Sequence, residues 1–195
     1  GLQSHFERAI FTPLGMEDTG FVLPDSKTAR MTDAWRLEES GARVPADLGA
    51  RSGWRRAGCF FSGGGGLVSS AADYHRFARM LLRGGELDGH RLLSAETVAA
   101  MRTNQLPGGS DLAALSSAMF SEADYQAVGF GLGFAMGLEG GEYYWGGVFS
   151  TYFWIDPVED LVFVGMIQQF GQGIPDVRSL SRRLTYQAII DANGT

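Results

Sequence analysis

The spacing of apolar residues changes near residue 129, and this change divides the chain into a helical part and a strand part. From Gly129 onward, Phe130, Leu132 and Phe134 alternate with small residues, a period of two that predicts a β-strand. Turns of hairpin length separate three further strand segments, which are Glu142–Trp145, Ser150–Ile155 and Leu161–Ile167. The sequence therefore predicts an antiparallel meander over residues 129–167.

Before residue 129, polar capping residues followed by apolar stripes predict three short helices. Ser4 opens a capping box, and Pro13 is expected to end the helix that follows. Ser70 and Asp73 form a second box, which opens a helix through about residue 82. Ser94 caps a third helix, through about residue 103. Residues 22–62 lack a clean period and are interpreted as long, partly extended loops.

A last helix is expected from residue 176 to residue 192, and it is expected to cover the sheet. Its apolar stripe consists of Val177, Leu180, Leu184 and Ala188. The stretch Leu161–Ile167 is apolar on both faces, which predicts a central strand with helices on both sides. The predicted fold class is α+β in a single domain. Residues 1–128 would form helices and loops over a site, residues 129–167 the antiparallel sheet, and residues 176–192 the final helix.

Composition excludes some classes of partner. The 195 residues include 16 basic and 22 acidic side chains, a formal net charge of −6, which disfavours nucleic acid and anionic membrane surfaces as partners. No run of about 18 apolar residues occurs. Cys59 is the only cysteine, so no internal disulfide can form, and a buried, inert thiol is expected. The compartment stays open, and no cofactor is expected.

The sequence does not support a phosphate loop, a metal site or a histidine-based serine triad. The glycine run at residues 62–70 lacks the Gly-Lys-Ser/Thr of a phosphate loop and is better interpreted as a tight turn. His5, His75 and His90 have no metal-ligand spacing, and we expect His75 and His90 to face solvent. No Gly-x-Ser-x-Gly occurs, so a histidine-based serine triad is disfavoured. We therefore expect no metal site.

The stretch "YYWGGVFSTYFWIDP", residues 143–157, contains the most informative feature of the strand part. Gly146 and Gly147 are adjacent inside a predicted strand, where glycine packs nothing and lowers stability. One interpretation is a bulge or corner without function. The other is that the glycines let a ligand lie against the strand edge, where a backbone N–H could stabilise an oxyanion. The residues alone leave both interpretations open.

Taken in order, six stretches resemble one family, the class C β-lactamase-related serine hydrolases, which include esterases and D-alanyl-D-alanine carboxypeptidases. The stretches are "IFTPLGMEDTGF" (10–21), "SGGGGLVSSAADYHRFARMLLRGG" (62–85), "LDGHRLLSAETVAAM" (87–101), "GFGLGFAM" (129–136), "YWGG" (144–147) and "FWIDPVEDLVFVGMI" (153–167). The resemblance implies a β-lactamase/transpeptidase-like fold and covers the later half of the family's sequence. It also implies a small-molecule ester, amide or β-lactam substrate, cleaved through an acyl-enzyme.

By this resemblance, Trp145, Gly146 and Gly147 match the Trp-Gly-Gly form of the family's third active-site motif. The backbone N–H of Val148 would then be one oxyanion-hole donor, and Trp145 would wall the pocket. The resemblance also favours an esterase over a β-lactamase, because Trp145 replaces the lysine that meets the substrate carboxylate in members acting on β-lactams.

Two family motifs are absent from the sequence. Neither Ser-x-x-Lys nor Tyr-x-Asn occurs, and the only lysine, Lys27, has Pro24 three residues before it. The "KTA" at 27–29 mimics the third motif but lies in an early loop and lacks its glycine, so it is interpreted as coincidence.

These absences lead to expectations about the chain as a whole. We expect it to be the C-terminal part of a longer hydrolase, with an incomplete fold. We expect the activity of the chain by itself to be about 10⁶-fold lower than that of the complete enzyme. Association with the missing N-terminal segment, or self-association, would follow, and a monodisperse monomer in light scattering would count against it. The alternative is a non-catalytic, truncated paralogue that acts as a binding or interaction module.

Overall fold

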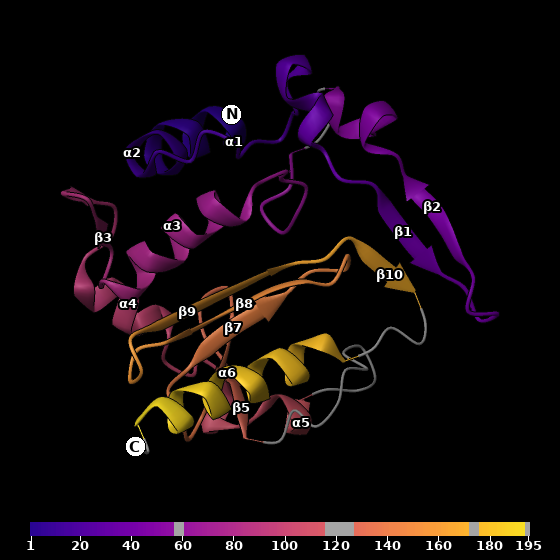
Figure 1. Cartoon of the computed structure of the whole chain (residues 1–195). Coiled ribbons are helices and arrows are strands. Elements are labelled where there is room, and N and C mark those ends of the chain that lie inside the picture. The colour runs from indigo at the N-terminus through magenta and orange to yellow at the C-terminus, as the bar shows by residue number, and fades with distance from the viewer. Residues whose placement is uncertain (57–60, 116–126, 172–175, 194–195) are drawn as a thin grey trace.

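The computed structural model describes residues 1–56, 61–115, 127–171 and 176–193, which form a mixed α+β structure (Figure 1). Its α-helices are α1 (Leu2–Phe6), α2 (Thr12–Leu14), α3 (Ala71–Leu82), α4 (Ala95–Met101), α5 (Leu112–Leu115) and α6 (Val177–Asn193). A π-helical turn over Glu7–Phe11 joins α1 to α2, and 3-10 turns lie at Asp25–Arg30, Gly49–Arg51, Gly53–Arg55 and Pro107–Gly109. The strands are β1 (Ala34–Leu37), β2 (Arg43–Asp47), β3 (Glu86–Leu87), β4 (His90–Arg91), β5 (Val128–Phe130), β6 (Ala135–Gly137), β7 (Tyr143–Gly146), β8 (Thr151–Asp156), β9 (Leu161–Met166) and β10 (Gln169–Gly171).

The main sheet has five strands in the order β5-β6-β7-β8-β9, each antiparallel to its neighbour, which confirms the predicted meander. The α3 and α6 helices lie on opposite faces of this sheet (Figure 1). The prediction that Leu161–Ile167 forms a central strand is wrong for the described residues, among which β9 is the last strand of the sheet. The α3 helix packs on β9 and no residue of β9 is fully buried, so the apolar run did not mark a central position.

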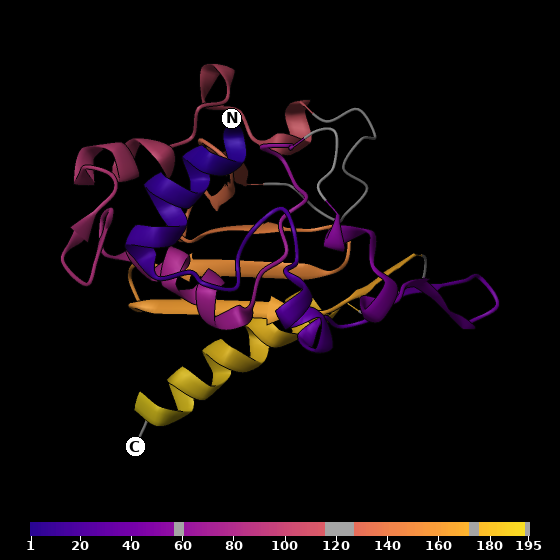
Figure 2. The same ribbon diagram turned by 90° about the horizontal axis from the view of Figure 1, so that it is seen from above.

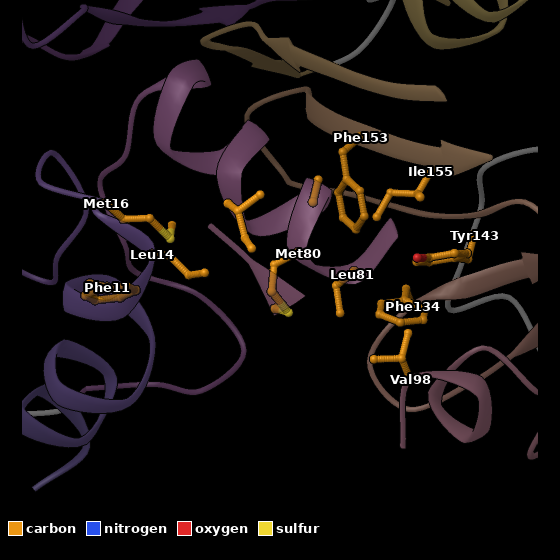
Figure 3. Packing of buried hydrophobic residues seen from close by; sticks show 12 residues of the cluster. Phe11, Leu14, Met16, Met80, Leu81, Val98, Phe134, Tyr143, Phe153 and Ile155 are labelled. Atoms are coloured by element: carbon orange, nitrogen blue, oxygen red, sulfur yellow. The ribbon is translucent and has the colours of Figure 1, made fainter. Parts of the chain in front are cut away.

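The hydrophobic core lies between α3, the sheet and the N-terminal helical segment (Figure 3). Met80 and Leu81 of α3 are each 1% exposed, and Leu14 of α2 is fully buried. From the sheet side, Phe153 and Ile155 of β8 reach the same cluster. Because these side chains come from three separate elements, the core fixes how α3 and the N-terminal segment sit over the sheet.

Of the three helix starts predicted before residue 129, two are confirmed by their capping hydrogen bonds. Ser70 Oγ accepts from the Asp73 amide at 3.2 Å, and Ser94 Oγ accepts from the Thr97 amide at 3.1 Å. The prediction for the first helix is wrong at both ends, since Ser4 lies inside α1 and Pro13 lies inside α2. Pro13 is tolerated because it occupies the first turn of α2, where no intrahelical partner needs its missing N–H.

Residues 22–62 contain more regular structure than the predicted loops. The β1 and β2 strands form an antiparallel hairpin, and β10 adds to β1 in parallel, giving a second sheet of three strands. This hairpin extends away from the main sheet (Figure 2). These short strands were not predicted because their residues lack a regular apolar alternation. Cys59, expected to be a buried thiol, lies outside the described residues.

The last helix covers one face of the sheet as expected, but with a different side of its surface. Leu180 and Leu184 of the predicted stripe are 45% and 56% exposed, so this part of the prediction is wrong. Polar contacts hold α6 instead: the Tyr152 hydroxyl lies 2.7 Å from Ser181 Oγ, and Arg182 forms an ion pair with Glu142. None of the described helices is both long and apolar enough to cross a membrane.

Candidate functional site

The four candidate residues lie where β7 ends and turns into β8. Trp145 and Gly146 are the last residues of β7 and pair with Phe153 and Tyr152 of β8. Gly147 and Val148 continue into the connecting turn. The structure thus keeps together, at one end of the sheet, the residues that the sequence placed next to one another.

The turn at residues 147–150 has defined hydrogen bonds. The Gly147 amide donates to the Thr151 carbonyl at 2.7 Å, and the Ser150 amide donates to the Gly147 carbonyl at 3.0 Å. Ser150 has a φ of 62°, so this is a three-residue hairpin loop of the kind built from a type I turn followed by a left-handed residue. Gln169 fastens the loop from outside, because its amide donates to the Phe149 carbonyl and its carbonyl accepts from Ser150 Oγ.

The edge of β7 is open beside the two glycines in the described part of the chain. The β6 strand pairs with β7 only at Tyr143 and Tyr144, and no described strand pairs with β7 on that side at Gly146. Backbone groups of successive residues in a strand point to alternate sides. Since the Gly147 amide points to Thr151 of β8, the amide and carbonyl of Gly146 face the open side.

Val148 is the accessible residue of this turn. It is 76% exposed, and no described residue accepts a hydrogen bond from its amide. In the turn the Val148 N–H follows the Gly147 carbonyl, which accepts both from the Ser150 amide and from Arg178 Nη2, at 3.2 Å. A backbone donor with no described acceptor therefore lies next to an open strand edge.

The two glycines leave space for other side chains of the protein. A Cβ on Gly146 would lie 2.5 Å from Cζ of Arg178, on α6, and a Cβ on Gly147 would overlap Thr151 Oγ1. Gly146 thus permits a close approach by the guanidinium from the α6 face of the sheet. Trp145 points to the opposite face, where it packs against the core and meets the ring of Phe130 edge-on at 5.1 Å.

Sequence reasoning did not identify Arg178. It lies 31 residues after Gly147, in another element, and belongs to a stretch with three arginines, so nothing local distinguishes it from a surface charge. The Arg178 guanidinium also lies 6.0 Å from the centre of the Tyr152 ring. Only the packing of α6 on the sheet brings it to the β7–β8 turn.

Lys27 belongs to a separate cluster. Its Nζ lies 2.8 Å from Asp18 Oδ1, and Arg30 forms a second ion pair with the same carboxylate at 2.6 Å. The hydrogen bonds from Arg30 and Lys27 hold the pKa of Asp18 well below its usual range. A cavity of about 310 Å³ lies beside this cluster, between the N-terminal helix and the loop that follows it. "KTA" at 27–29 therefore contributes to a surface ion-pair cluster on a 3-10 turn, not to the β7 strand.

A second cavity, of about 320 Å³, lies between α6 and the sheet, beside two buried carboxylates. The Tyr186 hydroxyl lies 2.6 Å from Asp156 Oδ2 and 3.1 Å from Glu142 Oε2. Burial, followed by the hydrogen bond to Asp156, raises the pKa of Tyr186 above its usual range. Arg182 Nε completes the cluster at 3.1 Å from Glu142. Because these groups bind one another, the cluster serves to hold α6 on the sheet.

The three histidines are exposed, as expected for His75 and His90. Among residues 1–56, 61–115, 127–171 and 176–193, no group of three or more histidine, cysteine or acidic side chains could hold a metal ion.

This chain is similar in sequence to a known protein family and to two curated proteins. The profile of the family described as Beta-lactamase matches residues 1–187. Protein Rv1367c of Mycobacterium tuberculosis (strain H37Rv) is 33% identical over 176 residues, which cover 83% of this chain and 42% of that protein. The uncharacterized protein MT1414 of M. tuberculosis (strain CDC 1551) gives the same figures. The chain therefore spans less than half the length of the curated relatives that it matches.

Solved structures are similar to this chain in fold, and the chain again spans about half of each. The LovD6 mutant of simvastatin synthase from Aspergillus terreus matches with a TM-score of 0.75 and 26% identity, over 93% of this chain and 47% of that one. EstCE1, described as a hydrolase with promiscuous acyltransferase activity, matches with a TM-score of 0.67 and 22% identity, over 89% of this chain and 47% of its own. A penicillin binding protein from Bacillus halodurans matches with a TM-score of 0.61 and 18% identity, over 93% and 49%.

Proposed function

Because this chain belongs to the beta-lactamase family of serine hydrolases, we propose that it is the C-terminal part of an enzyme that cleaves carboxylic esters or small amides through an acyl-enzyme. In this proposal the chain supplies the oxyanion strand, with Val148 as a donor, Gly146 and Gly147 as the uncluttered edge, and Trp145 as a wall beside it. The nucleophile comes from polypeptide outside this sequence, since Ser-x-x-Lys does not occur in it.

The observation that supports the proposal is that Val148 is exposed, next to the open edge of β7, and that no described residue accepts a hydrogen bond from its amide. When a nucleophile attacks a carbonyl group, negative charge develops on its oxygen as the tetrahedral intermediate forms. A preorganised N–H at about 2.7–3.1 Å from that oxygen stabilises it more than it stabilises the ground state. The space that side chains on Gly146 and Gly147 would fill is taken by Arg178 and Thr151, so in this proposal the acyl group lies along the backbone edge of β7.

Esters are the favoured substrate class. By the family resemblance, Trp145 replaces the lysine that meets the substrate carboxylate in members acting on β-lactams, which favours esters over β-lactams. EstCE1 is described as a hydrolase with acyltransferase activity, which supports acyl transfer as the reaction type without naming the substrate.

The test is an assay of the complete reading frame that contains this chain, with p-nitrophenyl esters and nitrocefin as substrates. We expect the complete protein to hydrolyse esters faster than nitrocefin. We expect the rate of hydrolysis by this chain alone to be about 10⁶-fold lower. A complete frame without Ser-x-x-Lys, or without activity on either substrate, would favour the non-catalytic binding module.

A single substitution tests the proposed donor. Val148→Pro removes the N–H, while proline is favoured at the second position of a type I turn, so the turn should form. We expect kcat/KM to fall about 10²–10³-fold. Val148→Ala keeps the N–H and should stay within about threefold of the wild type. Equal effects of the two substitutions would show that the amide is not the donor.

A further inference from the structure

Arg178 contacts the one peptide unit on which the proposed function depends. Its Nη2 donates to the Gly147 carbonyl at 3.2 Å, and its guanidinium occupies the space that a side chain on Gly146 would fill. The contact is charge-assisted and part-buried, which makes it stronger than a neutral hydrogen bond on the surface.

The geometry of the peptide bond connects this contact to the candidate donor. The Gly147 C=O and the Val148 N–H belong to one planar, trans peptide unit, in which the oxygen and the hydrogen point in opposite directions. The carbonyl is held by the Ser150 amide inside the turn and by Arg178 from α6. Holding the carbonyl on that side keeps the N–H directed away from α6 and toward open space.

Arg178 is itself held in place by the first turn of α6. Asp176 Oδ1 accepts from the Ser179 amide at 3.1 Å. This hydrogen bond caps the helix at the turn that contains Arg178. Ser181 Oγ lies 2.7 Å from the Tyr152 hydroxyl, which joins this turn to β8. The Tyr152 ring, 6.0 Å from the guanidinium carbon, adds a cation–π contact. The arginine therefore joins a rigid helix start to a short turn.

From these contacts we infer that Arg178 is a positioning residue of the oxyanion strand. It fixes the direction of the Val148 N–H through the Gly147 carbonyl, and its charge polarises that peptide unit, so that the N–H becomes a stronger donor. The inference rests on the proposed function. It also gives the paired glycines separate roles: Gly146 admits the guanidinium, and Gly147 presents the carbonyl that the guanidinium holds.

The kinetic test uses the complete ester hydrolase. We expect Arg178→Met to lower kcat for a p-nitrophenyl ester about tenfold, with KM within about threefold, because the loss acts on the transition state. Arg178→Lys, which keeps the charge, should recover part of kcat. An unchanged kcat in Arg178→Met, or a rise in KM alone, would overturn the inference.

A double mutant tests the route through Gly146. The Cβ of Gly146→Ala meets the flexible end of Arg178, so this substitution should displace the guanidinium and lower kcat to a similar extent. The double variant of Gly146→Ala with Arg178→Met should be no slower than either single variant, because both remove the same contact. If the double variant lowered kcat by the product of the two single effects, the inference would be contradicted.

A measurement on this chain alone separates the inference from the proposed function. In ¹⁵N-labelled protein, residual dipolar couplings report the direction of the Val148 N–H. We expect this coupling to change in Arg178→Met while the couplings of β8 stay constant. An unchanged Val148 coupling would refute the positioning role even if the enzyme is active. A changed coupling in an inactive enzyme would refute the proposed function and leave the structural role standing.

Discussion

At the scale of single residues, two glycines in strands are explained by side chains that approach them from elsewhere. Gly146 of β7 faces the guanidinium of Arg178, and Gly165 of β9 faces the ring of Tyr152, which a Cβ would overlap. Glycine inside a strand lowers stability by itself, so a close approach by another group is the physical reason for its presence. The sequence suggested at Gly146 the approach of a ligand, whereas the structure places a side chain of the protein beside both glycines.

Gly165→Ala should therefore destabilise the protein by about 1–3 kcal/mol, because the added methyl group forces the buried Tyr152 ring away from its place. Gly63→Ala is the matched control, since a Cβ there meets nothing within 4 Å. The control should leave the free energy of unfolding unchanged or raise it by up to about 1 kcal/mol. Urea denaturation measures both, and similar values for the two variants would contradict the close approach.

At the scale of elements, α6 is held on the sheet by polar groups. Glu142, which directly precedes β7, and Asp156 at the end of β8 are buried carboxylates, and Tyr186 and Arg182 of α6 bind them. Leu180 and Leu184 face outward from the same helix. The apolar periodicity of the helix therefore indicated the wrong face, since a stripe shows that one side is apolar without showing which side meets the sheet.

Tyr186→Phe should lower the free energy of unfolding by about 2 kcal/mol, because it removes the hydroxyl from two buried carboxylates. Leu184→Glu should change it by less than about 0.5 kcal/mol, since the side chain is exposed. If the exposed stripe mediates self-association, Leu184→Glu should also reduce the mass measured by light scattering. A loss above about 1 kcal/mol in Leu184→Glu would show that this side chain packs.

At the scale of the whole molecule, tyrosines with raised pKa values make stability depend on alkaline pH. Burial raises the pKa of Tyr74 and that of Tyr143 to about 12, and burial with the hydrogen bond to Asp156 raises the pKa of Tyr186 further. Near pH 10 an unfolded chain loses its tyrosine protons, while the folded protein keeps those of these three residues. The unfolded state then binds fewer protons, so stability is complete below about pH 10 and falls as the pH rises.

The urea midpoint should accordingly stay constant between about pH 7 and pH 9 and decrease above about pH 10. Absorbance at 295 nm should show that only part of the tyrosines ionise near pH 10 in the folded protein, and that the rest ionise on unfolding. Tyr74→Phe should make the decrease less steep. A midpoint that does not change up to pH 11 would show that these pKa values are not raised.

Features that depend on neighbours in the chain could be predicted from the sequence. The caps at Ser70 and Ser94, the meander of residues 129–167 and the adjacent position of Trp145, Gly146 and Gly147 all follow from contacts over a few residues or from strand alternation. The first helix could not be placed in this way, because a π-helical turn lets the chain continue through Pro13. The β1–β2 hairpin also escaped prediction, since its pairing is stabilised by β10 from the far end of the chain.

The sequence by itself determined the family, the kinds of element and the strand that carries the candidate donor, because these depend on local spacing and on an ordered series of motifs. Only the tertiary structure decided which face of α6 meets the sheet, that β9 lies at its edge, and that Arg178 reaches the Gly147 carbonyl. The physical reason is that docking depends on side chains from distant elements filling one another's space. A contact between residues 31 positions apart produces no pattern of apolar and polar positions in the sequence.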